Sequence, residues 1–282
     1  MRSTLVAVVG MIVLLASACS TSDTTPSQSD TRGLAHIHGL GVDPADGALY
    51  AGTHYGVYRL SSERAPELVG DIVQDFMGFT VAGPNHFLGS GHPGEGDRDH
   101  PPSLGLIEST NSGKSWTSVS MNGAADFHSV DYRHGLVYGL DSGTRTVMVS
   151  ADKHTWDRRS AISAVDIAVS PRNPNEILAT TADGLARSLD QGKTFTPVGV
   201  QARLVLLSWP TEDPLIGIDA AGAVYASEDS GTTWQARRAL SDRPQALLAP
   251  GGGVVFVATD TGIQRSTDNG TTFEAFYAFD RR

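Results

Sequence analysis

The chain has 282 residues, with 21 Lys and Arg against 31 Asp and Glu, so its formal net charge is −10. Hydrophobic residues make up 40% and charged residues 18%, a mixture that excludes a disordered chain. The acidic balance argues against electrostatic binding to nucleic acid, and the single cysteine excludes an intrachain disulfide and cysteine-rich zinc sites.

The first residues carry a targeting signal. Residues 5–18 form an apolar run of 14 residues after Arg2, which is too short to span a membrane and is typical of a signal peptide. The run ends in small residues directly before Cys19, and this arrangement resembles the lipobox of bacterial lipoproteins, whose cysteine is acylated. An ordinary cleaved signal with an incidental cysteine is the alternative.

The lipobox resemblance implies three segments. We expect a lipoprotein signal peptide at 1–18, a flexible tether at 19–33 and a folded domain at 34–282. The tether prediction rests on the absence of apolar residues that a core could bury. The mature protein would then sit on the extracytoplasmic side of the cell membrane and touch the membrane through its lipid alone.

The rest of the chain repeats. One string of eight residues recurs at Ser109–Trp116, Ser188–Phe195, Ser227–Trp234 and Ser266–Phe273. A shortened copy without glycine occupies Ser150–Trp156, so the leading serines fall at intervals of about 40 residues. This regular spacing indicates one structural unit per repeat.

The string reads Ser-x-Asp-x-Gly-x-Thr-Trp/Phe and resembles the Asp-box (BNR) repeat of sialidase-like propellers. Its chemistry is that of a turn, because the carboxylate accepts backbone N–H groups, glycine tolerates a positive φ, and the aromatic ring packs on the sheet. We therefore interpret the repeated acidic or amide residue as structural rather than catalytic. These residues are Asn111, Asp152, Asp190, Asp229 and Asp268.

Short strand-like runs surround each string. For example, Ile177–Thr181 and Leu185–Ser188 precede one string, and Glu274–Phe279 follows another. Four strands in about 40 residues form a propeller blade, and blades starting near 35, 75, 125, 164, 203 and 244 predict an all-β, six-bladed β-propeller. The first blade lacks the string, and residues 93–102 form an insertion between the second and third strands of blade two.

One face of this propeller collects histidines. The starts of first strands and the turns between second and third strands lie together on the face opposite the repeated strings. Five histidines and one aspartate at these places are the candidate ligand or acid–base residues: His36, His38, His54, His92, Asp126 and His128. Imidazole and carboxylate suit a divalent transition metal, and His38, His54, His92 and His128 are the candidate metal ligands. Packing of single histidines against the neighbouring blade is the alternative.

The function stays open between a binding module and an enzyme. The chain resembles small bacterial Asp-box lipoproteins labelled glycosyl hydrolases, so a glycoside hydrolase is one expectation. Sialidases of this superfamily hold their substrate with three arginines, whereas Arg59, Arg187 and Arg265 fall on third strands, away from the axis. We therefore favour a lipid-anchored module for a glycan, small molecule, metal or protein ligand, and not for nucleic acid.

Overall fold

The computed structural model describes residues 1, 34, 36–71, 73–199, 202–211 and 213–279. The predicted signal peptide from residue 2 onward, Cys19 and the tether at 19–33 lie outside the described residues. Within the described part of the chain, no helix has the length and apolar character needed to cross a membrane.

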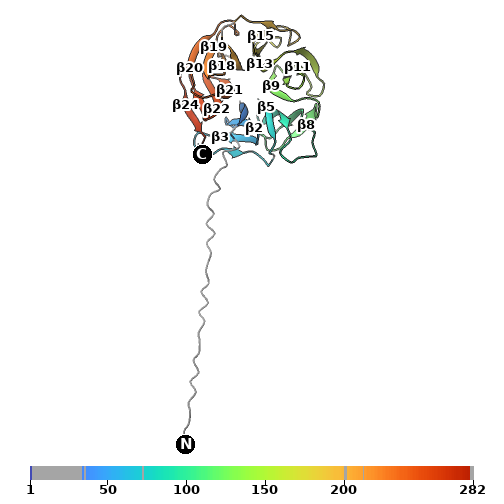
Figure 1. The fold of residues 1–282 in the computed structure, drawn as a ribbon, viewed down its shortest axis with the longest axis vertical. Coiled ribbons are helices and arrows are strands. Elements are labelled where there is room, and N and C mark those ends of the chain that lie inside the picture. The colour runs from blue at the N-terminus through green and yellow to red at the C-terminus, as the bar shows by residue number, and fades with distance from the viewer. Residues whose placement is uncertain (2–33, 35, 72, 200–201, 212, 280–282) are drawn as a thin grey trace.

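Six four-stranded antiparallel sheets form a closed ring of blades, and each sheet consists of four strands that follow one another in the chain (Figure 1). This confirms the predicted all-β, six-bladed propeller. The first strands begin at residues 37, 75, 127, 164, 204 and 244, within two residues of the predicted blade starts. The first strands contact one another around the ring, so each blade turns its first strand toward the centre.

The strands of the first two blades are β1 (Ile37–Val42), β2 (Leu49–Thr53), β3 (Gly56–Leu60), β4 (Glu67–Leu68), β5 (Asp75–Gly83), β6 (His86–His92), β7 (Leu106–Ser109) and β8 (Thr117–Ser120). Blades three and four contain β9 (Phe127–Arg133), β10 (Leu136–Asp141), β11 (Thr146–Ser150), β12 (Asp157–Ala161), β13 (Ala164–Val169), β14 (Ile177–Thr181), β15 (Gly184–Ser188) and β16 (Thr196–Pro197). Blades five and six contain β17 (Leu204–Ser208), β18 (Leu215–Asp219), β19 (Ala223–Ser227), β20 (Gln235–Ala239), β21 (Pro244–Gly251), β22 (Val254–Thr259), β23 (Gly262–Ser266) and β24 (Glu274–Ala278). The insertion at 93–102 lies between β6 and β7, as predicted.

The hydrophobic core lies between blades rather than inside them. The described residues contain six buried apolar clusters, and each joins residues of two neighbouring blades. Tyr50 and Val57 of blade one pack against Phe76, Phe79 and Phe87 of blade two in one such cluster. Burying one such aromatic ring contributes about 1.5–3 kcal/mol, so these interfaces hold the ring of blades together.

The ring closes between blade one and blade six without an exchanged strand. At this seam, Ile37 and Leu40 of β1 pack with Ala246 of β21 and Phe256 of β22. One side-chain bond joins the same strands, because the backbone N–H of Ile37 donates to Oε1 of Gln245 at 3.0 Å. The chain crosses every other junction between blades, whereas side chains and their contacts close this one.

Polar side chains of one blade accept hydrogen bonds from the inner strand of the next blade. An inner strand has a sheet partner on one side only, so its N–H groups on the other side need acceptors. The acceptor comes from the preceding blade in each of these bonds: Phe127 N to Ser90 Oγ (3.0 Å), Val169 N to Asp131 Oδ2 (3.1 Å), Leu207 N to Asp166 Oδ2 (2.9 Å) and Ala249 N to Ser208 Oγ (2.8 Å).

The repeated strings form one kind of turn between the third and fourth strands. In the copy of blade four, Ser188 Oγ accepts the N–H of Gly192 at 2.8 Å, and Asp190 Oδ1 accepts the N–H of Thr194 at 2.9 Å. Gln191 and Gly192 have φ values of 63° and 82°, a region that glycine occupies at little cost. Hydrogen bonds from the Thr194 hydroxyl and amide lower the pKa of Asp190 to about 2.

The other copies follow the same pattern. The amide oxygen of Asn111 replaces the carboxylate and accepts the N–H of Ser115 at 3.0 Å, while Asp229 and Asp268 accept the N–H groups of Thr233 and Thr272. In the shortened copy, Asp152 accepts the N–H groups of His154 and Thr155. Every predicted structural residue of the strings therefore caps its own turn. The resemblance of these strings to Asp-box repeats stays a prediction.

Candidate functional site

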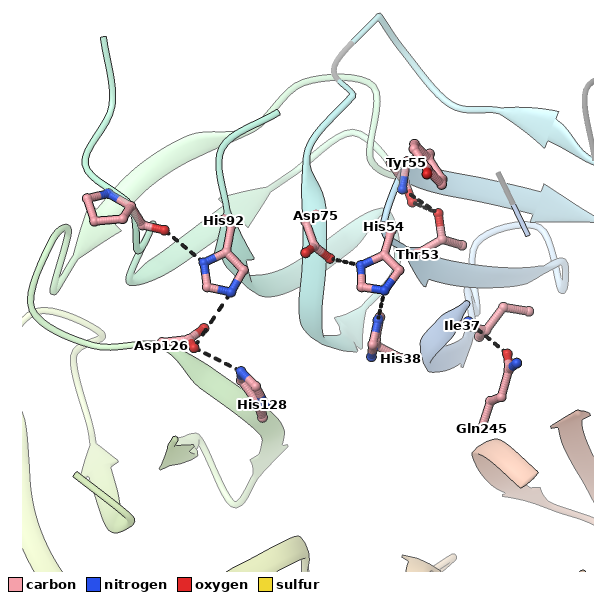
Figure 2. A network of polar contacts seen from close by, with 12 residues as sticks. Ile37, His38, Thr53, His54, Tyr55, Asp75, His92, Asp126, His128 and Gln245 are labelled. Carbon is pink, nitrogen blue, oxygen red and sulfur yellow. Dashed lines mark hydrogen bonds and ion pairs between the residues drawn. The ribbon is translucent and has the colours of Figure 1, made fainter. Parts of the chain in front are cut away.

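The candidate residues come from three neighbouring blades and gather on the face opposite the repeated turns. In blade one, His36 precedes β1, His38 lies in it, and His54 follows β2. Asp75 and His92 are the first residue of β5 and the last of β6 in blade two. In blade three, Asp126 precedes β9 and His128 is its second residue. Figure 2 shows the side chains of six of these seven residues, all but His36, turned toward one another in two groups.

The first group, which we call the three-histidine cluster, consists of His36, His38 and His54. One ring nitrogen from each of the three lies within 4.8 Å of the other two. The ring centroids are 4.5 Å apart for His38 and His54 and 5.0 Å apart for His36 and His54. Three imidazoles at this spacing match the nitrogen ligand set of a divalent transition metal.

Asp75 orients the His54 ring from the neighbouring blade. The Nδ1–H of His54 donates to Asp75 Oδ1 at 2.7 Å (Figure 2). In neutral His54 the other ring nitrogen, Nε2, then carries a lone pair, and it lies 3.3 Å from Nε2 of His38. A carboxylate that holds the second nitrogen of a ligating histidine is the usual support of a metal-binding imidazole.

His38 is held in its neutral form. Burial, together with the neighbouring charge of His54, lowers the pKa of His38 to about 4. A neutral imidazole is the form that binds metals, because protonation occupies the lone pair that the metal needs. The environment of His38 therefore favours coordination over an ion pair.

The second group, which we call the His–Asp–His cluster, consists of His92, Asp126 and His128. Its three ligand atoms also lie within 4.8 Å of one another. The Nε2 of His128 lies 2.8 Å from Asp126 Oδ2, and the Nε2 of His92 lies 3.8 Å from the same oxygen (Figure 2). Two nitrogens and one carboxylate oxygen form a donor set with one negative charge.

Asp126 stays ionised although it is half-buried. Burial alone would raise its pKa, but hydrogen bonds from His128 and from the Ser142 hydroxyl outweigh burial and hold the pKa below its usual range. The Ser142 Oγ donates to Asp126 Oδ2 at 2.7 Å. The second oxygen, Oδ1, is buried and accepts no hydrogen bond in the described structure.

A cavity of about 380 Å³ opens in the centre of the ring beside both clusters. The inner strands of all six blades line it, and His38 and His128 contribute to its wall, one from each cluster. Asp131 and Asp166 face the same cavity, where burial raises the pKa of both carboxyls, to about 6 for Asp166.

The structure divides the predicted ligands between two groups. The sequence predicted His38, His54, His92 and His128 as one set, and these residues lie two by two in separate clusters. His36 completes the first cluster and Asp126 the second. Asp75 was not among the candidate ligands predicted from the sequence. Its position at the start of a first strand, the same kind of position that some of the candidate residues occupy, could have indicated it.

Comparisons with known proteins agree on the fold. No family model matches the sequence. A curated xyloglucanase of Hypocrea jecorina (strain QM6a) is 28% identical over 159 residues, which cover 51% of this chain and 19% of that protein. The chain therefore spans about a fifth of the curated relative that it matches.

Solved structures include enzymes and a peptide complex. A GH74 xyloglucanase from Xanthomonas campestris superposes with a TM-score of 0.56 at 17% identity, covering 86% of this chain and 45% of that chain. YCF48 bound to D1 peptide superposes with a TM-score of 0.59 at 12% identity, covering 88% of this chain and 95% of that one. At these identities the likeness extends to the propeller fold alone.

Proposed function

We propose that this protein is a lipid-anchored, extracytoplasmic propeller that binds a divalent transition metal such as Zn²⁺ or Cu²⁺ at its three-histidine cluster. The observation that carries the proposal is the approach of one ring nitrogen each from His36, His38 and His54 to within 4.8 Å. The depressed pKa of His38 and the Asp75 carboxylate behind His54 support it.

Three protein nitrogens leave room for a further ligand on the metal. Structural zinc sites are closed by four protein ligands, whereas sites with three keep a position for water or an exchangeable ligand. His36 is exposed, so the cluster is open to solvent. We infer a site that exchanges its metal or presents the metal to a further ligand, rather than a structural site whose metal only stabilises the fold.

Metal binding to the full chain, purified without a histidine tag, tests the proposal. We expect His54→Ala to lower the Zn²⁺ or Cu²⁺ bound at saturation by one ion per chain, measured by titration calorimetry and elemental analysis. His154→Ala is the matched control, because His154 is exposed and lies on the opposite face. Equal binding by both variants, or no binding by the unchanged chain, would overturn the proposal.

The anchor has a separate test. If Cys19 carries the lipid, Cys19→Ser moves the protein from the membrane fraction to the soluble fraction and leaves metal binding unchanged. A variant that stays in the membrane fraction contradicts the anchor.

A glycoside hydrolase is the second candidate, and the xyloglucanase relative is the observation that favours it. On this alternative, the ionised Asp126 and His128 beside the central cavity would serve as acid–base groups. It predicts turnover of xyloglucan or another glycan that Asp126→Ala or His128→Ala abolishes. Absence of turnover on a broad glycan panel contradicts it.

A further inference from the structure

We propose that His92, Asp126 and His128 form a second metal site, which binds a divalent transition metal such as Zn²⁺ through two imidazole nitrogens and one carboxylate oxygen. This site shares no ligand with the three-histidine cluster, so it does not depend on the proposed function of that cluster.

The ligand atoms are close to coordinating positions. Two ligands of one tetrahedral zinc ion, each about 2.0–2.2 Å from the metal, lie about 3.3–3.5 Å apart. The His128 Nε2 and the His92 Nε2 lie 2.8 Å and 3.8 Å from Asp126 Oδ2, on either side of that value. Each nitrogen is therefore within a few tenths of an ångström of the coordinating separation from Oδ2, and all three ligand atoms lie within 4.8 Å of one another.

The His92 ring is fixed with its free nitrogen toward Asp126. Its Nδ1 lies 2.8 Å from the carbonyl oxygen of Pro102, which can only accept, so Nδ1 carries the proton (Figure 2). In the neutral ring, Nε2 then presents a lone pair to the Asp126 carboxylate. Two acceptors that face each other repel, and a cation between them turns both into ligands.

The Asp126 carboxylate has capacity that no described donor uses. Without a metal, its Oδ2 accepts bonds from the Nε2–H of His128 and from the Ser142 hydroxyl, whereas its Oδ1 is buried without a hydrogen bond. When the ion binds, the Nε2 proton of His128 moves to Nδ1 or is released to solvent, and the freed lone pair becomes a ligand. Buried polar atoms without a partner are rare in folded proteins and point to an ion or water at the place concerned. Two neutral imidazoles do not balance the negative charge of the Asp126 carboxylate. A divalent ion bound at this cluster would balance it.

The proposed site gives the insertion of blade two a role. Residues 93–102 begin directly after His92 and end with Pro102, the residue whose carbonyl holds the His92 ring. A backbone carbonyl on the far nitrogen of a ligating histidine fixes its tautomer and its orientation. The insertion thus acts as a positioning element for one ligand.

The donor sets of the two clusters predict different preferences. The three-histidine cluster offers three neutral nitrogens, whereas the His–Asp–His cluster adds a hard, charged oxygen. Soft and monovalent ions such as Cu⁺ gain little from a carboxylate, so we expect Cu⁺ to bind the His–Asp–His cluster poorly relative to Zn²⁺ or Co²⁺.

Zinc titration of the full chain in a His54→Ala background isolates the second site. We expect this chain to bind one Zn²⁺ and to show the intense visible bands of tetrahedral Co²⁺ when Co²⁺ replaces Zn²⁺. Adding His92→Ala should weaken Zn²⁺ binding about 100-fold or more, and Asp126→Asn about 10-fold or more. His100→Ala is the matched control, because His100 lies in the same insertion and bonds Asp97 instead.

The outcomes separate this proposal from the proposed function. If the His54→Ala chain binds no Zn²⁺, or if His100→Ala weakens binding as much as His92→Ala does, the second site is wrong. If His54→Ala leaves all binding intact while His92→Ala removes it, the three-histidine cluster fails and the second site stands. His92→Gln, which keeps a polar side chain of similar size, replaces His92→Ala if the alanine variant has a lowered melting temperature.

Discussion

Replacing Ser188 with alanine tests how the repeated turns stabilise the propeller. Ser188 is buried, and its Oγ accepts the N–H of Gly192 at 2.8 Å and that of Asp190 at 3.3 Å. Alanine removes this acceptor and leaves the Gly192 N–H buried without a partner. An orphaned buried donor costs about 1–3 kcal/mol, so we expect the free energy of unfolding to fall by about that amount.

Ser150 provides the matched comparison. It occupies the same place in the shortened string and is equally buried, but its Oγ only donates one bond of 3.2 Å to Asp152. Ser150→Ala therefore orphans no backbone N–H and should cost about 0.5–1.5 kcal/mol.

Urea unfolding followed by tryptophan fluorescence measures both variants, and an unchanged m value keeps the comparison valid. Ser227→Ala and Ser266→Ala should behave like Ser188→Ala, because both serines accept the N–H of the corresponding glycine. If Ser150→Ala costs as much as these three substitutions, the glycine N–H bond is not what stabilises the turn.

Two further predictions concern charged groups around the ring. Asp75→Asn keeps a hydrogen-bond acceptor near His54 but removes the negative charge of the carboxylate. Metal affinity at the three-histidine cluster should therefore fall about 10- to 100-fold with little change in melting temperature. An unchanged affinity in calorimetry refutes the supporting role of Asp75. Asp166 has a folded pKa of about 6, above its usual 3.8. Between these values the folded state binds the proton and the unfolded state does not, so this carboxyl stabilises the fold at low pH and loses its contribution as pH rises toward 6. The free energy of unfolding of the unchanged chain, relative to that of Asp166→Asn, should therefore fall by about 2–3 kcal/mol between pH 4 and pH 7. Urea titrations at these pH values measure both chains, and a constant difference between them contradicts the raised pKa of Asp166.

The fold followed from the sequence because its signal is local and repeated. Each string contains its own turn: Ser188, Asp190 and Gly192 satisfy one another within five residues, and the same geometry returns in three other blades. Short strand-like runs then marked the strands on either side. These interactions need no knowledge of distant parts of the chain, so a single sequence was sufficient.

The grouping of the site residues could not be derived in the same way. Histidines and acids could be assigned to one face, but the pairing of His54 with Asp75 joins two blades and depends on how far one blade rotates against the next. His54 and His92 fall in two separate clusters where the sequence suggested one. The Pro102 carbonyl that holds His92 belongs to an irregular loop, for which residue types carry no geometric signal.

The seam between the first and last blades makes the ring a closed loop in space but an open one in sequence. Because each blade is built from consecutive strands, cutting the chain in any turn between blades and joining the present ends would preserve every sheet. Such circular permutants should fold to the same ring, with the seam moved to a new junction. Moving the seam would alter the surroundings of the three-histidine cluster. His36 and His38 flank Ile37, and the N–H of Ile37 bonds Gln245 across the present seam. A permutant with a covalent link at this junction would therefore show whether the contact between Ile37 and Gln245 influences metal binding at the cluster.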